Sequence, residues 1–220
     1  MTGVAECTAD LDQSHQARSH CRTSGGCHLL CGGGAGSQWT TELAAWHLQT
    51  KSAPNDPRTA AAYRQLELQT DRLFQFLTER IGPYRVEVTF TFLRRPYQSD
   101  HEMIGAVISE RRLEVSVAAS DRCRLHPLLD CRPGGSYDRF RAVHDLVGHA
   151  FGRLGFDADG EYWAWRIQDL LYKGSARLAL AAELRVEHAV LQETGDFSDH
   201  KALVVPRAYV LLEYSTAQGT

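Results

Sequence analysis

The sequence predicts an α+β fold that is mostly helical, in which a small two- or three-stranded sheet is followed by a three-helix bundle. Residues 84–92 alternate apolar and polar side chains without interruption, which is typical of a half-buried strand. A second alternating stretch follows after a short helical one. From residue 138 onward, apolar residues recur at helical spacing through three successive segments. This order places the sheet in the first half of the domain.

The length, composition and charge of the chain limit the classes of protein to which it can belong. The 220 residues suit one ordinary domain with a tail, and 43% hydrophobic residues are enough for a core. Because 24 Lys and Arg residues face 27 Asp and Glu residues, we expect neither nucleic acid nor a membrane surface as a partner. No apolar run reaches the roughly 18 residues that span a bilayer, and residues 1–5 lack the features of a secretory signal, so the expected location is the cytoplasm.

The first 50 residues differ from the rest. Residues 22–37 are rich in Gly and Ser, and four of the six cysteines lie before residue 32. The spacing of these cysteines fits no common zinc pattern well. We therefore expect residues 1–50 to be a disordered Gly/Ser/Cys-rich tail and residues 51–220 to form a single domain.

The domain is expected to begin with a long helix. Asp56 can cap this helix with Pro57 in its first turn, and Gly82 follows its end. The next elements are a strand over 84–92, a short helix over 99–108 and a second strand with Leu113, Val115 and Val117 on its inner face. Strand, helix and strand in this order predict a crossover connection between neighbouring strands.

Three helices are expected in the second half, over residues 138–153, 161–173 and 175–193. Glycine-containing breaks separate them. The last apolar segment, residues 204–214, fits either a strand or a helix.

Two histidines on the first of these helices are the strongest functional signal. His144 and His149 are five residues apart, which is about 140° around an α-helix. Gly148 and Gly152 point into the sector between the two imidazoles and leave a notch in which a metal ion could sit. Asp145 lies beside the notch and could orient a ligand from behind.

The third helix supplies candidate carboxylates. Its apolar stripe consists of Leu180, Leu184 and Leu191. Glu183 and Glu187 project within or beside that stripe, whereas Arg185 lies on the side expected to face solvent. A buried unpaired carboxylate costs on the order of several kcal/mol, so each glutamate should be neutralised, paired or bound to metal. Pairing with a buried arginine, Arg139 or Arg141, is the alternative to metal binding.

Two histidines and one glutamate make a 2-His-1-carboxylate set. Three protein ligands on one side of a metal leave open positions opposite, which suits non-haem Fe(II) or catalytic zinc. Glu161 opens the middle helix, where an acid complements the helix dipole, and is also a candidate for a further carboxylate at the metal. Trp165, Gln168 and Tyr172 share its face and could line a pocket.

The stretch His144-Asp-Leu-Val-Gly-His149 resembles the His-Glu-Leu-Leu-Gly-His motif of the biopterin-dependent aromatic amino acid hydroxylases. The resemblance implies that both histidines bind iron and that a downstream glutamate completes the ligand set. Glu183 lies 34 residues after His149 and Glu187 lies 38 after it. The setting Ala-Ala-Glu183-Leu is more similar to that of the family's glutamate, so the resemblance assigns the ligand role to Glu183.

Two features limit what this resemblance implies. Asp145 stands where the family has a glutamate, and the pterin loops find no match, so a pterin cofactor is not expected. The stretch beginning Phe140-Arg-Ala-Val-His144 also resembles a group of actinobacterial and phage proteins, over residues 60–190, which brings no established activity.

The sequence therefore predicts that residues 51–220 are a metal-binding catalytic domain with His144, His149 and Glu183 as ligands. The expected activity is that of a mononuclear non-haem Fe(II) oxygenase, hydroxylase-like, in specialised metabolism. It would use O₂ and a small substrate, of which aromatic amino acids are one candidate class. The candidate catalytic residues are Asp145, Glu187 and Arg132, the last to hold a substrate carboxylate.

Other readings stay open. A zinc hydrolase and a non-catalytic phage-like protein with a structural metal are the alternatives in function. A dinuclear site, and Glu161 or Glu187 as the ligating carboxylate, are the alternatives at the metal. The sequence leaves the oligomeric state undetermined.

Overall fold

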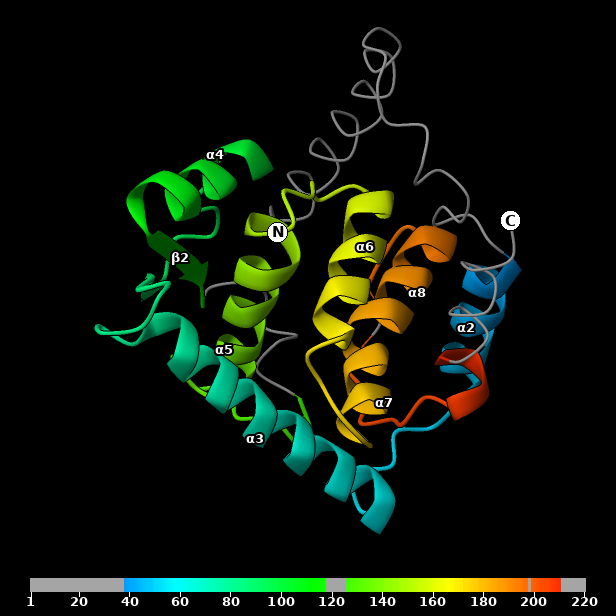
Figure 1. Ribbon diagram of the computed structural model, residues 1–220. Helices are drawn as coiled ribbons and strands as arrows, with labels where there is room; N and C mark the ends of the chain where they lie inside the picture. The colour runs from blue at the N-terminus through cyan, green and yellow to red at the C-terminus, as the bar shows by residue number, and fades with distance from the viewer. Residues whose placement is uncertain (1–37, 118–125, 198, 211–220) are drawn as a thin grey trace, which may run out of the picture. The chain divides into compact units, whose positions relative to one another are not determined.

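The computed structural model describes residues 38–117, 126–197 and 199–210. Within these ranges the chain is mostly helical with a two-stranded parallel sheet, which confirms the predicted α+β class (Figure 1). None of the helices in the described ranges is both long enough and apolar enough to cross a membrane.

The described part begins with a helix that the sequence analysis assigned to the tail. α2 (Gln38–Gln49) buries Leu43, Ala44 and His47 and packs against α8. The predicted boundary at residue 50 is therefore wrong for this segment. The apolar residues of α2 recur at helical spacing. The prediction for residues 1–50 was based instead on their overall composition, to which the Gly-rich stretch before α2 contributes most. Residues 1–37, which include the four N-terminal cysteines, lie outside the described residues.

α3 (Pro57–Thr78) is the long helix that the sequence predicted. The Asp56 carboxylate accepts a hydrogen bond from the backbone N–H of Thr59 at 2.8 Å, and Pro57 occupies the first turn, where it has no bond to lose. Asp56 therefore has a depressed pKa, first through this backbone hydrogen bond. The helix packs against both α5 and α7, so it joins the two halves of the described domain.

The sheet has the predicted strand–helix–strand order. The elements are β1 (Glu87–Thr91), α4 (Asp100–Gly105), its continuation η2 (Ala106–Glu110), which is a π-helical segment, and β2 (Arg112–Ser116). The strands are parallel, with Val88 opposite Leu113 and Phe90 opposite Val115. The inner positions of β2 are buried, as the alternation predicted.

The second half is helical as predicted, but two of its helices change type along their length. The elements are α5 (Ser136–Val143), η4 (His144–Ala150), α6 (Ala158–Asp169), α7 (Ala176–Ala181), η5 (Ala182–Val186) and α8 (Glu187–Thr194). η4 and η5 are π-helical segments. In the segment that was ambiguous in the sequence, residues 204–206 have no regular structure and residues 207–210 are helical.

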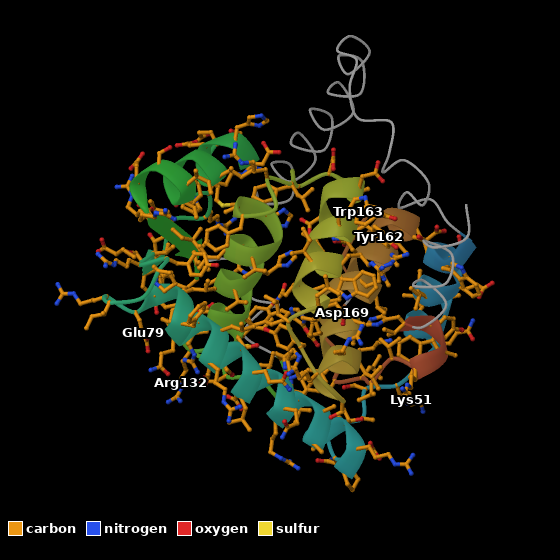
Figure 2. All side chains as sticks on the ribbon, in the orientation of Figure 1. Lys51, Glu79, Arg132, Tyr162, Trp163 and Asp169 are labelled. Carbon is orange, nitrogen blue, oxygen red and sulfur yellow. The ribbon has the colours of Figure 1, made fainter. Side chains whose placement is uncertain are left out.

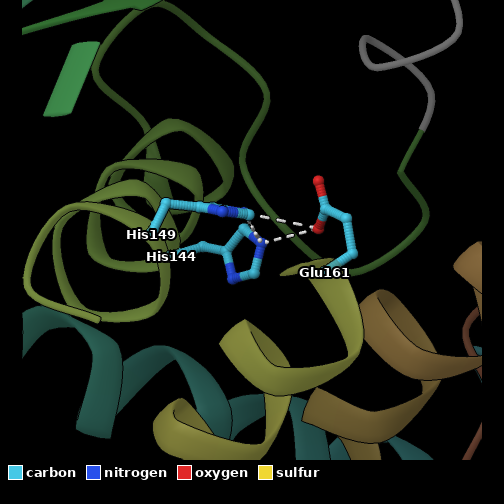
Figure 3. Close-up of side chains that lie close together, drawn as sticks. All are labelled: His144, His149 and Glu161. Carbon is cyan, nitrogen blue, oxygen red and sulfur yellow. Dashed lines mark hydrogen bonds and ion pairs between the residues drawn. The ribbon is translucent and has the colours of Figure 1, made fainter. Parts of the chain in front are cut away.

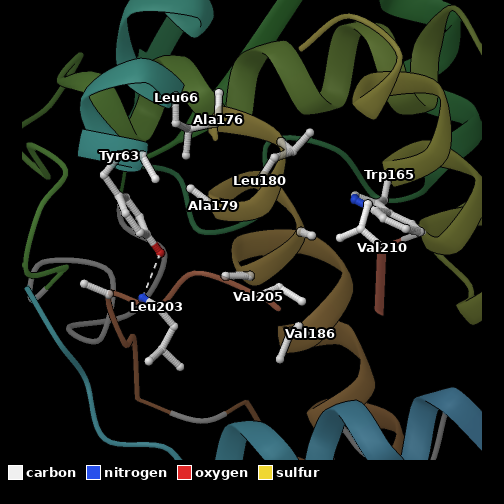
Figure 4. Close-up of a cluster of buried hydrophobic side chains, with 14 of the residues drawn as sticks. Tyr63, Leu66, Trp165, Ala176, Ala179, Leu180, Val186, Leu203, Val205 and Val210 are labelled. Atoms are coloured by element: carbon white, nitrogen blue, oxygen red, sulfur yellow. Dashed lines mark hydrogen bonds between the residues drawn. The ribbon is translucent and has the colours of Figure 1, made fainter. Parts of the chain in front are cut away.

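Two apolar clusters form the core. One lies among α2, α3, α6, α7 and α8, and Figure 4 shows it around Tyr63, Leu180 and Val186. The other fills the space between the sheet, α4 and the α5–η4 helix, where Val143 and Leu146 are fully buried. Since Val143 and Leu146 of the α5–η4 helix are anchored in this second cluster, its remaining side presents polar side chains to α6.

Candidate metal centre

The backbone of η4 brings His144 and His149 together. The N–H of Phe151 donates to the carbonyl of Leu146 at 2.9 Å, and that of Leu154 to the carbonyl of His149 at 3.0 Å, each across five residues. Such a turn takes more residues than an α-helical one, so side chains five apart lie nearly above one another. The predicted 140° separation therefore does not hold. The rings instead meet edge to face with centroids 4.7 Å apart.

A carboxylate from α6 completes a triangle of donor atoms. The Nε2 atoms of His144 and His149 are 3.1 Å apart, and Oε2 of Glu161 lies 3.2 Å from the first and 3.4 Å from the second (Figure 3). The His149 side chain is 1% exposed, whereas that of Glu161 is 19% exposed. We call these three residues the His144 cluster. It is buried on the histidine side and reachable from the Glu161 side.

Close packing between η4 and α6 sets this geometry. A Cβ added to Gly148 would lie 2.9 Å from the Cβ of Ala164, and one added to Gly152 would lie 3.0 Å from Ile167. The two glycines therefore make room for α6, and the predicted notch for a metal is filled by that helix. The donor atoms that could hold a metal lie instead at the tips of the imidazoles, beside the Glu161 carboxylate.

Both imidazoles are held with a lone pair facing the triangle. The Nδ1 atom of His149 is 3.1 Å from the carbonyl oxygen of Leu154, which can only accept, so Nδ1 carries the proton. The Nδ1 atom of His144 likewise faces the side-chain oxygen of Gln168 at 2.9 Å, and Gln168 is fully buried. In the neutral rings both Nε2 atoms are unprotonated. This is the arrangement of metal-binding histidines.

The charges agree with a site for a cation. Burial disfavours the carboxylate of Glu161, but the hydrogen bonds and charges of His144 and His149 outweigh it and hold its pKa far below the usual range. Burial likewise works against the charged form of His149, yet the contacts with Glu161 raise its pKa. Three lone-pair atoms at this spacing repel one another, so the triangle requires either a shared proton or a metal ion.

The triangle has the size of one face of a metal's coordination shell. Ligand atoms about 2.0–2.1 Å from a tetrahedral zinc ion are about 3.3 Å apart. Neighbouring ligands in an octahedral site with bonds of about 2.1 Å are about 3.0 Å apart. The observed separations of 3.1, 3.2 and 3.4 Å fit both, so the residues present suit a divalent metal held on one face.

The structure separates the predicted ligand Glu183 from the two histidines. η5 buries Glu183, whose Oε1 accepts hydrogen bonds from the Tyr63 hydroxyl and from His126 Nε2, the latter at 3.1 Å. The donor group around His144 and His149 contains Glu161, not Glu183. The structure therefore groups His144 and His149 with Glu161, and not with Glu183 as the sequence predicted. The short motif had no information about which helix faces the histidines.

Glu187 belongs with Glu183 rather than with His144. Its Oε1 lies 3.0 Å from Nδ1 of His200. Burial raises the pKa of Glu187, and the neighbouring negative charge of Glu183 raises it further. Burial also opposes ionisation of Glu183, but His126 and Tyr63 hold its pKa below the usual value. Neither carboxylate pairs with Arg139 or Arg141, the alternative that the sequence left open. Arg139 donates to Asp71 and Arg141 to the carbonyl of Ser116.

The other predicted catalytic residues lie outside the triangle. Asp145 is half-buried, and desolvation raises its pKa, but Gln168 rather than Asp145 contacts Nδ1 of His144. Arg132 is 86% exposed and holds Asp130 with two nitrogens (Figure 2). Arg185 was expected in solvent and is instead 3% exposed, because α2 covers it and Thr40 accepts its hydrogen bond at 3.0 Å.

Sequence reasoning missed some of these partners. Glu161, Ala164 and Gln168 occupy positions i, i+3 and i+7 of α6, which is one face of a helix. The small residue in the middle allows close approach, and the polar residues on either side reach the histidines. The shared face of Glu161 and Gln168 was the available signal. No pattern linked His126 or His200 to Glu183, because they lie in loops far away in sequence.

A small recess adjoins the exposed side of the triangle. It has a volume of about 10 Å³, room for about one water molecule, and is lined by Glu161 together with Tyr162, Arg185 and His188. Nδ1 of His188 is 3.9 Å from Oε2 of Glu161. Since the guanidinium of Arg185 lies over the ring of Tyr162 with 5.4 Å to the centroid, this side offers cationic and aromatic groups.

No family model, curated protein or solved structure compared with this chain matches it. The likeness of the His144–His149 motif to the aromatic amino acid hydroxylases stays an expectation based on six residues.

Proposed function

We propose that the protein is a mononuclear non-haem Fe(II) oxygenase in which His144, His149 and Glu161 bind the metal. The observation that carries this proposal is the triangle of donor atoms with sides of 3.1–3.4 Å, in which both imidazoles are held with their lone pairs inward. Two neutral histidines and one carboxylate on one face of a metal form the ligand set typical of non-haem iron oxygenases.

The number of donors favours a catalytic over a structural metal. A structural zinc site is closed by four protein ligands, whereas this donor group has three within the described residues. His188 approaches only Glu161, at 3.9 Å, and so does not close the shell. The open positions would face the side on which Glu161 and the recess lie, which gives O₂ and a substrate a route to the metal.

The recess is too small to enclose a substrate, so a substrate would lie over it. There His188 could donate to a carboxylate and Tyr162 could contact an aromatic ring, so an aromatic amino acid remains one candidate class. Bound iron would bind and activate O₂, and the two further electrons that each hydroxylation requires would come from an oxidisable co-substrate or an external reductant. The chain's own residues orient the ligands, keep water from the histidine side and position the substrate.

Metal analysis after anaerobic purification tests the proposal. We expect one equivalent of Fe(II) that depends on His149, together with an electron paramagnetic resonance signal when nitric oxide, a stand-in for O₂, is added. His149→Ala should lose both, while His101→Ala, an exposed histidine, should lose neither. O₂ consumption would then be measured with a panel of aromatic amino acids.

Two results would overturn the proposal. Tight zinc binding with hydrolysis of an ester or amide, and no O₂ consumption, would make the protein a zinc hydrolase. If the folded His149→Ala variant has the same metal content as the wild-type chain, the triangle is a proton-sharing network and not a metal site.

A further inference from the structure

A second group of buried donors lies on another face of the α7–α8 helix. Oxygen atoms of Glu183 and Glu187 and a nitrogen of His200 lie within 4.8 Å of one another. We call these three residues the Glu183 cluster. The helix presents Glu187 to this cluster, while the next residue, His188, approaches Glu161 in the His144 cluster. The proposed oxygenase site uses none of its members.

The surroundings fix one carboxylate without neutralising it. The backbone N–H groups of Leu128 and Leu129 both donate to Nδ1 of His126, at 3.1 and 2.8 Å, so this nitrogen carries no proton. The ring is therefore neutral, and its Nε2–H donates to Oε1 of Glu183. The Tyr63 hydroxyl donates to the same oxygen. Two neutral donors hold the carboxylate in place, but its negative charge remains.

The second oxygen of Glu183 lies on the side of His200. The Glu183 side chain is 2% exposed, and Oε2 makes no hydrogen bond with the described residues. Its nearest ionic partner is Nδ1 of His200 at 3.9 Å, and the same nitrogen lies 3.0 Å from Oε1 of Glu187. Two ligands of one ion with bonds of about 2.1 Å can be at most about 4.2 Å apart. Both separations from Nδ1 are within this limit.

We propose that Glu183, Glu187 and His200 form a second divalent-cation site, distinct from the oxygenase centre. Two carboxylates and one imidazole suit a zinc or manganese ion. The ion would compensate the buried carboxylates, which pair with no arginine among the described residues. His200 lies in an irregular segment, so the ion would tie residues 199–206 to the α7–α8 helix, and its role would be structural.

The competing arrangement is a proton in place of the ion. A protonated Nδ1 of His200 would donate to Glu187 and leave Oε2 of Glu183 without a partner. The proton and the metal cannot share Nδ1, so metal titration distinguishes the two arrangements.

The test uses the full chain in which the first centre has been removed. We expect His149→Ala to bind one equivalent of Zn(II) or Mn(II) in calorimetric titration, and to gain melting temperature when the ion is added. His149→Ala combined with His200→Ala should bind none and show no such gain. The matched control combines His149→Ala with His101→Ala, whose imidazole is 94% exposed, and should bind one equivalent.

Some results would overturn the second site. A folded His149→Ala chain that binds neither ion would show that a proton occupies the Glu183 cluster. If His149→Ala does not fold by circular dichroism, Glu161→Gln, which keeps the shape of the side chain, takes its place. Failure of the oxygenase proposal has a different signature, because a wild-type chain with only the second site would bind one ion that depends on His200 and not on His149.

Discussion

The two His/Glu clusters contain the same residue types, but the rings of His144 and His149 in one and of His126 beside the other are held in opposite ways. In the His144 cluster, acceptors behind the rings, the Gln168 side chain and the Leu154 carbonyl, leave lone pairs facing the carboxylate. Beside the Glu183 cluster, two backbone N–H groups occupy the lone pair of His126, which turns an N–H toward the carboxylate. The group bonded to the far nitrogen therefore decides whether a histidine binds a metal or positions an acid.

The clusters also share a backbone feature. His144 and His149 lie in η4, and Glu183 lies in η5, both π-helical. Such segments are rare in proteins as a whole. Where they do occur, they often lie at functional sites, because they change which side chains meet along a helix. At η4 the consequence is a pair of imidazoles in contact. At η5 it is a buried carboxylate directed at Tyr63 and His126.

The largest expected effect comes from replacing one glutamate in each cluster by glutamine and comparing the two variants. Glu161→Gln should lose the metal that depends on His149, with an affinity lower by roughly two orders of magnitude or more, because one of three ligands loses its charge. Glu183→Gln should keep that metal. Elemental analysis of both variants checks the assignment. Loss only in Glu183→Gln would restore the ligand set expected from the sequence.

A second prediction tests the orienting residue. Gln168→Leu keeps the volume but removes the acceptor for His144 Nδ1, so metal affinity at the His144 cluster should fall about 10–100-fold. Gln75→Leu, an exposed glutamine on α3, is the matched control and should have no effect. Equal affinities in the two variants would show that Gln168 does not set the tautomer of His144.

A third prediction concerns the contact between η4 and α6. Gly148→Ala places a methyl group 2.9 Å from the Cβ of Ala164, and such overpacking costs about 1–3 kcal/mol. The melting temperature should fall by about 3–10 °C, and the metal bound at the His144 cluster should weaken. Gly105→Ala is the control, since nothing lies within 4 Å of the added atom and alanine favours a helix. Thermal unfolding of both chains measures the difference.

A fourth prediction concerns the effect of His47, near the Glu183 cluster, on how the free energy of unfolding changes with pH. Burial, and then the charge of Lys201, lowers the pKa of His47 from 6.5 to about 4. Between these values the unfolded chain binds a proton that the folded chain does not, so stability falls as pH drops from about 6.5 to 4. At pH 5 the loss relative to pH 8 should be about 2 kcal/mol. Denaturant unfolding of the metal-free chain should show this loss, and His47→Gln should lack it.

The smallest expected effect is at Arg132, which the sequence proposed for substrate binding. Because its side chain is exposed and pairs with Asp130 at the surface, Arg132→Ala should leave melting temperature and metal content unchanged. Activity of the iron-loaded chain should also be unaffected. A raised KM with an unchanged kcat would return Arg132 to the list of substrate-binding residues.

The sequence by itself determined the features that depend on neighbours along the chain. The Asp56 cap and Pro57 started α3, strict alternation identified β1, and helical spacing placed the two histidines on one helix. It also indicated that Glu183 and Glu187 would be buried, since both accompany a leucine stripe. Each of these inferences uses a period or a capping preference within about twenty residues.

Only the tertiary structure decided which groups meet. The π-helical turn of η4 replaced the α-helical angle between His144 and His149, and the close approach of α6 selected Glu161 instead of Glu183. α2 covered Arg185, which was expected to face solvent. These outcomes depend on packing between distant segments, where the fit of small residues such as Gly148 against Ala164 fixes which polar side chains come into contact, and no local pattern records that fit.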